Sequence, residues 1–530
     1  MENEQIVDAL ELLVKLWDVH GLNEFKSKNL SFAARGLDKF PGRIANLTED
    51  ELYAIPGVGK VVIQIVRDIA QTGTCPDLEA MIEQSPPGIL DLLKVKGLGP
   101  KKVGLVWKEL GITELDDLLA ACESGQLEQL KGFGKSVTEN VRTYILFLQE
   151  NRKKMRINKA EMLSDDLLNL LAPKFSKIAV SGELARDCEV ISALVFVAQT
   201  YDIFGSQSLI EEIQGFQTDH QQSSPFTWRG HFEGHLIPID IHFTDASQFD
   251  MMVYQWSAHP EHLGQVNYFK LKNVLEEFSW SEKHSSDELI EMADLKGCVH
   301  NHSTYSDGKN TLLEMAEASR AMGLQYFGIA DHSQYAAYAG GLKEEDLQCQ
   351  HAEIDSLNAQ WSDFKILKGI EADILPDGSL DYNPRILASF DYVVASVHAQ
   401  LVMDQDRAME RLLKAIENPY TSILGHPTGR LLLTRAGYPI DTLKILDACR
   451  ANGVSIELNA SPYRLDLDWR YIYAAMEKGV YVSINPDAHK IEGLKDMEYG
   501  VRVGRKGGLL KSLTLNALPL PEIMKFFSKA

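Results

Sequence analysis

The stretch Cys298-Val299-His300-Asn301-His302-Ser303-Thr304-Tyr305-Ser306-Asp307-Gly308 decides how the C-terminal half of this chain folds. An apolar lead-in ends in two histidines one residue apart, and an aspartate follows five residues after the second. Because side chains alternate along a strand, a strand over 295–300 would turn His300 and His302 to the same side. Two imidazoles at a strand end can begin a metal site if the chain supplies further ligands.

The residues beyond 291 alternate between strand-like and helix-like runs. Apolar runs predict strands near residues 295–300, 325–330, 366–370, 391–397, 421–425, 454–458 and 480–485. Helices are predicted between them at Leu312–Met322, Glu344–Gln360, Ala408–Glu417, Leu443–Asn452 and Asp468–Lys478. Seven such units predict a parallel barrel, in which active sites form where the C-terminal ends of the strands meet.

Metal-binding side chains gather at these predicted strand ends. Six of the seven histidines beyond residue 290 fall there, and only His351 does not. The candidate metal ligands and catalytic residues are His300, His302, Asp307, His332, Glu371, His398, His426, Asp487 and His489. Imidazole and carboxylate ligands without thiolate suit zinc, manganese or iron better than magnesium alone. Nine ligands exceed the need of one ion, and a shared carboxylate such as Glu371 could bridge two.

A second pattern recurs three times before residue 150, in a region that reads as helical. Each copy has an apolar residue, any residue, glycine, an apolar residue and glycine before a helix-like run, at intervals of 40 and 35 residues. Such a turn can present backbone N–H groups to a phosphate at a helix N-terminus, and neighbouring lysines add charge. The predicted DNA-contacting residues are Gly57, Gly59, Lys60, Gly97, Gly99, Lys101, Lys102, Gly132, Gly134 and Lys135.

These units resemble helix-hairpin-helix motifs, which grip DNA backbones without reading the sequence. With the segments that follow, nearly the whole chain is similar to the bacterial family X DNA polymerases that carry a C-terminal PHP domain. The resemblance implies a multidomain α and α/β fold. Its predicted parts are helix-hairpin-helix domains over 1–80 and 81–150, a nucleotidyltransferase-like α+β palm over 151–285, and a distorted (β/α)7 PHP barrel over 291–530. The basic cluster Arg152–Arg156 marks the start of the palm.

The palm-like segment departs from the polymerase motif of that family. Strands are predicted over 178–182, 193–198 and within 232–243. The family motif has Gly-Ser, an arginine pair and then Asp-x-Asp, whose carboxylates hold two magnesium ions with a third carboxylate from a later strand. The matching positions are Gly182, Glu183, Ala185, Arg186, Ala193, Val195 and Asp240. Alanine and valine cannot ligate magnesium, so the comparison implies a polymerase fold without nucleotidyl transfer.

The resemblance to PHP domains also divides the nine barrel residues among three metal ions. It implies one ion held by His300, His302, Glu371 and Asp487, a second by Glu371, His398 and His426, and a third by Asp307, His332 and His489. Divalent ions of this kind activate water near neutral pH and neutralise phosphate oxygens. Lys309 and Arg430 are candidate phosphate contacts.

Composition and charge narrow the setting. The 530 residues contain no uncharged apolar run that approaches the roughly 18 to 20 residues needed to span a membrane. Six scattered cysteines without a CxxC pair predict neither a disulfide framework nor a thiolate zinc site. The N-terminus lacks a signal-peptide pattern, so the predicted location is cytoplasmic. The net charge of -22 argues against bulk attraction to nucleic acid, and any DNA contact is expected to be local.

The leading hypothesis is a DNA-binding, metal-dependent phosphoesterase, either a 3′→5′ exonuclease or a DNA-end processing enzyme of repair. One alternative is a phosphatase of small phosphomonoesters, which the N-terminal DNA-binding signature opposes. Another is a repair scaffold without catalysis, which the complete ligand set opposes. The sequence leaves open the identity of the metal, the end preference, nucleotide binding by the palm and the oligomeric state.

Overall fold

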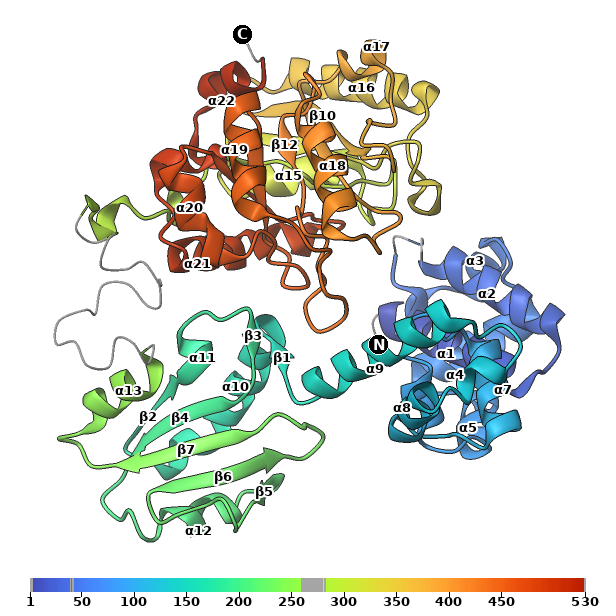
Figure 1. Cartoon of the computed structure of the whole chain (residues 1–530), viewed down its shortest axis with the longest axis vertical. Helices are drawn as coiled ribbons and strands as arrows, with labels where there is room; N and C mark the ends of the chain where they lie inside the picture. The colour runs from blue at the N-terminus through green and yellow to red at the C-terminus, as the bar shows by residue number, and fades with distance from the viewer. Residues whose placement is uncertain (1–2, 39, 41, 259–279, 281–282, 529–530) are drawn as a thin grey trace. The chain divides into compact units, whose positions relative to one another are not determined.

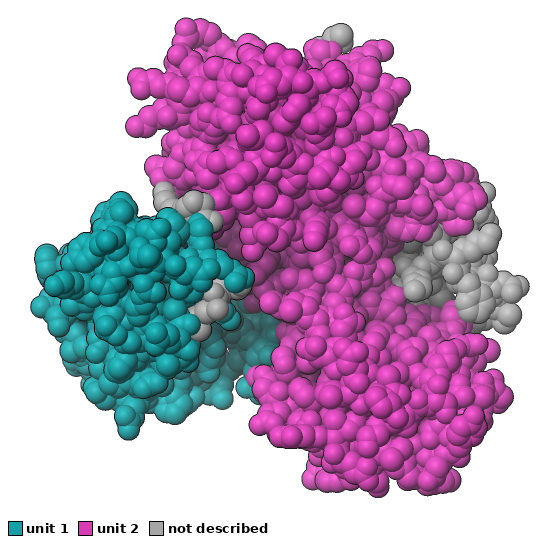
Figure 2. Space-filling model, turned by 180° about the vertical axis from the view of Figure 1, so that it is seen from behind, with its two compact units in different colours: residues 1–152 teal, residues 153–530 magenta. Residues whose placement is uncertain are grey.

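The computed structural model describes residues 3–38, 40, 42–258, 280 and 283–528. It separates into two compact units, Met1–Arg152 and Lys153–Ala530 (Figure 2). The predicted palm includes residues 259–279 and 281–282, which lie outside the described residues, and the finer domain boundaries stay predictions. Among the described residues, no helix is long and apolar enough to cross a membrane.

The N-terminal unit is built from helices, as predicted (Figure 1). Its α-helices are α1 Asn3–His20, α2 Glu24–Asp38, α3 Glu49–Ala54, α4 Lys60–Thr72, α5 Pro76–Glu83, α6 Ile89–Leu92, α7 Pro100–Leu110, α8 Leu115–Glu123 and α9 Lys135–Asn151. Helix α1 buries Ile6, Leu10 and Leu13 completely, because apolar residues spaced three or four apart share one helix face. That face packs against α2, α5 and α7.

The three glycine repeats form the predicted turns. The first glycine of each has a left-handed backbone, with φ of 84° at Gly57, 87° at Gly97 and 92° at Gly132. The second glycine is the N-cap residue of the helix that follows, namely Gly59 for α4, Gly99 for α7 and Gly134 for α9. The apolar residue between each pair is buried: Val58, Leu98 and Phe133. Each turn is therefore pinned by one buried side chain while its backbone stays at the surface.

The middle part of the chain, within the second unit, holds a five-stranded mixed sheet in the order β2-β4-β7-β6-β5. These strands are β2 Lys177–Ser181, β4 Leu194–Gln199, β5 Phe216–Thr218, β6 Thr227–Phe232 and β7 Ile239–Thr244, and a separate pair joins β1 Met155–Arg156 to β3 Val190–Ile191. The helices are α10 Ile157–Leu171, α11 Gly182–Ala185, α12 Ser206–Glu211 and α13 Phe249–Ser257. The strands predicted near 178–182 and 193–198 are confirmed, and the 232–243 stretch spans the turn from β6 to β7.

Seven parallel strands, β8 to β14, follow each other in chain order in one sheet. They are β8 Gly297–Cys298, β9 Tyr326–Ile329, β10 Lys365–Asp373, β11 Tyr392–Ser396, β12 Ile423–Leu424, β13 Ser455–Asn459 and β14 Val482–Asn485. A parallel bridge between Asn301 and Ala488 links the segments just beyond β8 and β14, which nearly closes the sheet into a barrel. The predicted seven-stranded architecture is confirmed.

Helices cover the outside of the barrel (Figure 1). They are α15 Leu312–Ala321, α16 Glu344–Gln360, α17 Pro384–Leu387, α18 Gln405–Ile416, α19 Thr442–Asn452, α20 Ile472–Glu477 and α21 Met497–Lys506, while α22 Leu520–Phe527 packs against the interior at one end. All five predicted helices are present, and α17, α21 and α22 are additional.

Two tyrosines at strand starts fill the barrel interior. Tyr326 and Tyr392 pack in one buried cluster with residues of α22, and the rings of Tyr392 and Phe527 stack with centroids 4.9 Å apart. Neighbouring strands make room for these rings with glycine. At Gly328 an added Cβ would lie 2.9 Å from Cζ of Tyr392 and 2.7 Å from Cγ1 of Val299. One end of the barrel is thus a close-packed apolar plug, which leaves the other end for polar side chains.

We expect Gly328→Ala to destabilise the chain by roughly 1–3 kcal/mol, because the added methyl group overpacks the plug. Tyr392→Leu removes the ring that the methyl group would meet. The double variant should therefore lose less stability than the sum of the two single losses, measured as free energies of unfolding in urea. Strict additivity of the two losses would show that the glycine and the tyrosine are not coupled.

Candidate functional site

A buried carboxylate, Glu371 of β10, lies at the centre of a ring of imidazoles. Its side chain is 1% exposed. Its Oε1 lies 3.1 Å from Nε2 of His300, 3.1 Å from Nε2 of His398 and 3.0 Å from Nε2 of His426, and its Oε2 lies 2.9 Å from Nδ1 of His332 and 3.7 Å from Nε2 of His302. Five rings from four loops therefore converge on one side chain, because His300 and His302 share the loop after β8.

Two further carboxylates extend this group on either side of His302. Asp487 Oδ1 lies 3.0 Å from Nε2 of His302 and 3.7 Å from Nε2 of His300. Asp307 Oδ1 lies 3.3 Å from Nε2 of His489, 3.7 Å from Nε2 of His332 and 3.9 Å from Nδ1 of His302. The structure thus brings all nine predicted residues together, and we call them the barrel cluster.

The ligand atoms of the barrel cluster fall into overlapping sets whose members lie within 4.8 Å of one another. These sets are His302, Asp307, His332 and His489; His300, Glu371 and His426; His300, His302 and Asp487; and His332, Glu371 and His398. The first contains the predicted third ion's ligands. His398 shares a set with His332, whereas the resemblance paired it with His426, so the division among individual ions stays a prediction.

Unusual backbone angles aim several of these side chains. Strand β8 ends at Cys298, whose side chain packs in the core between the sheet and the surrounding helices. The side chain of Val299 packs inside the barrel, in the cluster of Tyr326 and Tyr392. Simple alternation would therefore turn His300 outward. Its φ of 68° reverses that direction, and φ is also positive at His426 (22°) and Asp487 (52°). The prediction that His300 and His302 meet on one side holds, but its reason, an extended strand through residue 300, was wrong.

Two carboxylates outside the predicted ligand set orient the imidazoles. Glu457 Oε1 lies 2.6 Å from Nδ1 of His300, and its Oε2 accepts the backbone N–H of His426 at 2.6 Å. Asp373 Oδ1 lies 3.2 Å from Nδ1 of His398. A partner on Nδ1 fixes the ring and directs Nε2 toward the centre. Neither carboxylate was among the site residues predicted from the sequence. The signal that could have found Asp373 was its position two residues after Glu371 on one strand.

Burial and charge together set the protonation of the barrel cluster. Burial opposes ionisation of Glu371, but His398 and His300 outweigh it and hold the pKa of that carboxyl well below its usual range. Burial lowers the pKa of His398, but Glu371 and Asp373 outweigh it and raise that pKa to about 10. Burial, with His489 and His332, lowers the pKa of His302 to about 3. The carboxylates are therefore anionic, and positive charge is drawn to them.

The donor set of the barrel cluster fits divalent metal ions. Buried ligand atoms including His300 Nε2, His302 Nδ1 and Glu371 Oε2 have no hydrogen-bond partner within the described part of the chain. A metal ion would satisfy such atoms, since imidazole and carboxylate are its usual ligands. Among the described residues, the groups able to hold an ion all belong to this cluster.

An arginine lies at the edge of the barrel cluster. Arg464 Nε is 3.3 Å from Asp487 Oδ2. The predicted phosphate contact Arg430 is engaged elsewhere: it donates to the carbonyl of Arg464 at 3.0 Å, to Asp468 at 2.8 Å and to the carbonyl of Leu465. Arg430 therefore holds the loop that carries Arg464. The other predicted contact, Lys309, is exposed, and its backbone N–H donates to the carbonyl of His489 at 2.6 Å.

The palm-like motif residues form no comparable group. Val195 on β4 stands opposite Asp240 on the parallel strand β7. Asp240 Oδ2 lies 3.4 Å from Nε of Arg229, and burial raises the pKa of this carboxyl. Glu183 accepts hydrogen bonds from the Ser192 hydroxyl at 2.7 Å and the Ser192 N–H at 2.5 Å, just before Ala193.

The backbone beside Arg186 faces the barrel. Its carbonyl accepts a hydrogen bond from Nζ of Lys506 at 2.9 Å, and the next residue, Asp187, accepts two from Arg502 at 2.9 and 2.7 Å. The segment that carries the motif therefore anchors the middle part of the chain to α21.

The hairpin turns differ in how open they are. A Cβ added at Gly97, Gly99, Gly132 or Gly134 would meet nothing within 4 Å. At Gly57 it would meet the Phe32 ring of α2, so the first turn is partly covered. Of the predicted lysines, Lys60 and Lys135 are exposed, Lys101 pairs with Glu24, and Lys102 Nζ lies 5.1 Å from the centroid of the Phe133 ring.

Comparison with known families agrees with the separation into N-terminal hairpin turns and a C-terminal barrel. Residues 1–75 match the helix-hairpin-helix domain family, residues 89–142 match a SAM-like helix-hairpin-helix tandem, and residues 298–461 match the PHP domain family. The chain is 32% identical to the "DNA polymerase/3'-5' exonuclease PolX" of Bacillus subtilis (strain 168), over the full length of both.

Smaller relatives match only part of the chain. A probable phosphatase of Thermoanaerobacter sp. (strain X514) is 30% identical over 41% of this chain and 89% of its own length. Another, from Caldanaerobacter subterraneus subsp. tengcongensis, is 31% identical over 41% of this chain and 85% of its own length.

Glu457 lies outside the ligand set and holds the ring of the ligand His300. We expect Glu457→Gln to weaken that hydrogen bond and so to weaken metal binding by about 10- to 100-fold. The metal retained after dialysis against graded chelator, measured by atomic emission, checks this. Glu498→Gln, which makes the same change at an exposed position of α21, is the control. Equal metal retention by the two variants, with both folded by circular dichroism, would contradict a positioning role for Glu457.

Proposed function

Since this chain belongs to the family of PolX DNA polymerase/3′-5′ exonucleases, we propose that it binds DNA and hydrolyses phosphoester bonds at its 3′ ends. The observation that carries the proposal is the gathering of nine imidazole and carboxylate side chains, with Glu371 at their centre, at the open end of the barrel. The match of this barrel to the PHP family and the full-length relation to an exonuclease support it.

The residues of the barrel cluster would hold up to three ions of zinc, manganese or iron, in the sets implied by the PHP resemblance. Bound divalent ions would supply activated water and neutralise charge on the phosphate. Other side chains of the protein would position the metal ligands and the phosphate. Glu457 and Asp373 keep the rings of His300 and His398 fixed, which preserves the geometry between turnovers. Arg464, beside Asp487, is placed to contact a phosphate oxygen.

DNA would be held by the N-terminal unit through its backbone and without reading its sequence. The open turns at Gly97–Gly99 and Gly132–Gly134 present helix N-termini to solvent, and this arrangement suits a phosphate. The overall charge of -22 leaves such contacts local, so binding should be weak and sensitive to salt.

The palm-like sheet would take no part in nucleotidyl transfer. Ala193 and Val195 provide no oxygen ligand, and Asp240 is paired with Arg229. One carboxylate does not make a cage for two magnesium ions. What remains is a scaffold that connects the DNA-binding unit to the barrel.

A second candidate function is hydrolysis of small phosphomonoesters. It is favoured by the probable phosphatases, which are similar to this chain over 41% of its length. The two functions differ in what the N-terminal unit contributes, because a phosphatase of small molecules would gain nothing from open hairpin turns.

We expect the protein to shorten end-labelled primer from its 3′ end in the presence of manganese. Asp487→Asn removes one negative charge from the barrel cluster and so weakens its hold on a metal ion. Because a bound ion stabilises the transition state by several kcal/mol, we expect the rate to fall by roughly a hundredfold or more. Asp406→Asn, the same change at an exposed position of α18, should leave the rate unchanged. Denaturing gels of labelled primer–template measure both.

The same assay with deoxynucleotides tests the palm. No primer extension is expected. Extension that survives Asp240→Ala, or hydrolysis of phosphomonoesters with no degradation of any DNA, would count against the proposed function.

The hairpin turns permit a matched comparison. Gly99→Asp with Gly134→Asp places two negative charges where phosphates would approach, and both positions have room for a side chain. The isosteric Gly99→Asn with Gly134→Asn adds the same bulk without charge, and both residue types are good N-caps. We expect the Asp variant to bind DNA at least about tenfold more weakly than the Asn variant, a difference of roughly 1.4 kcal/mol.

Fluorescence anisotropy in chelator, with labelled primer–template, measures this binding without hydrolysis. Equal affinities of the Asp and Asn variants would show that these turns do not face the DNA backbone.

A further inference from the structure

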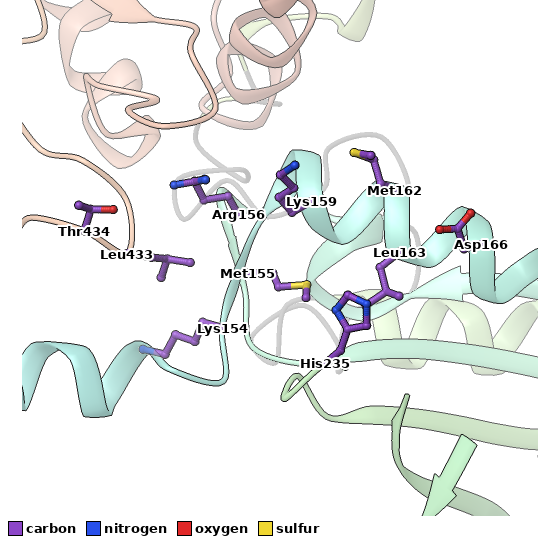
Figure 3. A pocket seen from close by; sticks show the side chains of 10 residues that line it. All are labelled: Lys154, Met155, Arg156, Lys159, Met162, Leu163, Asp166, His235, Leu433 and Thr434. Atoms are coloured by element: carbon purple, nitrogen blue, oxygen red, sulfur yellow. The ribbon is translucent and has the colours of Figure 1, made fainter. Parts of the chain in front are cut away.

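The basic cluster Arg152–Arg156 marked a boundary in the sequence, and the proposed function gives it no role. In the structure, Lys154, Arg156 and Lys159 line a cavity of about 480 Å³ (Figure 3). Asp166 is the one acidic residue of the lining. A volume of this size is typical of a ligand site. The basic lining contrasts with the charge of -22 on the whole chain.

The buried Nε atom of Arg156 on this lining has no hydrogen-bond partner among the described residues. Neither Arg156 nor Lys159 forms an ion pair with a carboxylate in the part of the chain that the structure describes. Burial lowers the pKa of the Arg156 guanidinium, and the Tyr463 hydroxyl opposes this shift only in part. A half-buried arginine without an acidic partner is stabilised by any anion that enters the cavity.

The opposite wall belongs to the barrel. Leu433 and Thr434, on the loop after β12, complete the lining, and Figure 3 shows Arg156 extending toward that loop. The neighbouring Leu432 donates its N–H to the carbonyl of Tyr463 at 2.7 Å. The cavity therefore lies between the middle part of the chain and a loop at the open end of the barrel.

A short series of contacts joins this cavity to the barrel cluster. The Arg156 guanidinium lies 3.8 Å from the centroid of the Tyr463 ring. The next residue, Arg464, lies 3.3 Å from Asp487. Basic groups thus continue from the cavity to the metal ligands, with one half-exposed aromatic ring between them. This combination suits single-stranded nucleic acid, whose phosphates pair with cations while its bases pack on aromatic and apolar surfaces.

We propose that this cavity, which we call the basic cavity, receives the single-stranded DNA segment that adjoins the 3′ end in the barrel cluster. Lys159 and Arg156 contact its phosphates, and Tyr463 with the apolar lining contacts its bases. The proposal rests on the proposed exonuclease function and deepens it, because it names an unpaired 3′ strand as the substrate. A duplex must be opened before its strand can follow this route.

The test compares Arg156→Gln with Lys159→Gln, as one double variant, against Lys511→Gln with Lys525→Gln. The control removes the same two charges from the end of the barrel where the strands begin. Two readouts are measured: the ratio of activity on a long single-stranded oligonucleotide to activity on a dinucleotide, and the salt dependence of oligonucleotide binding in chelator.

We expect the activity ratio to fall about tenfold in the basic-cavity variant, equivalent to roughly 1.4 kcal/mol, and to stay at the wild-type value in the control. The slope of log affinity against log salt should become shallower by roughly 1.4, since each phosphate contact on a single strand contributes about 0.7. Lys159→Gln alone should give about half that change in slope. Because Lys159 is exposed, this substitution should leave folding intact.

An unchanged ratio and slope in an active, folded variant overturns the basic-cavity proposal and leaves the exonuclease function standing. Absence of hydrolysis by the wild type overturns the proposed function, and the salt slope then still decides whether the cavity binds a strand. Displacement of the oligonucleotide by polyglutamate at equal charge would identify a site for acidic peptides and would also overturn the proposal.

Discussion

The buried charge of Glu371 is the constraint on which the barrel depends. An isolated carboxylate in such a place would cost far more free energy than a domain can spare, so it must be surrounded by positive charge. Five imidazoles from four loops do this, and a divalent ion of the kind that the ligand set suits would do it more strongly. The same demand for cations that holds the loops together also prepares the site to bind metal.

The two ends of the barrel solve different physical problems. At one end, Tyr326 and Tyr392 fill the interior against α22, and glycines on neighbouring strands provide the space. That end is held by close packing, which tolerates little change in volume. At the other end the interior is polar and positions are set by hydrogen bonds such as those of Glu457. Stability and chemistry are therefore separated along the barrel axis.

The palm-like part keeps a packed sheet although two of its three motif carboxylate positions hold apolar residues. Three carboxylates without metal would repel one another at the meeting of β4 and β7. Alanine and valine remove two of them, and Arg229 pairs with the third, Asp240. The nearby segment Arg186–Asp187 now binds the barrel helix α21 through Arg502 and Lys506. The sheet keeps its core because packing requires apolar residues and not metal ligands.

Much of the fold and of the barrel cluster could be predicted from the sequence. The alternation of strand and helix signals predicted seven units, and parallel strands bring their C-terminal ends together whatever fills the loops. The glycine repeats predicted three turns, because only glycine adopts the left-handed backbone of Gly57, Gly97 and Gly132 without strain. Both inferences depend on local geometry, which a short stretch of sequence carries.

Only the tertiary structure decided how distant segments meet. The positive φ of His300, the hydrogen bonds of Glu457 and Asp373, and the contact of Arg156 with Tyr463 each depend on residues far apart in the chain. The same holds for Phe32, which covers the first turn and leaves the other two open. Sequence spacing determined which residues could form the site. Packing between segments determined the direction of each side chain, because that direction is set by the neighbours it meets in three dimensions.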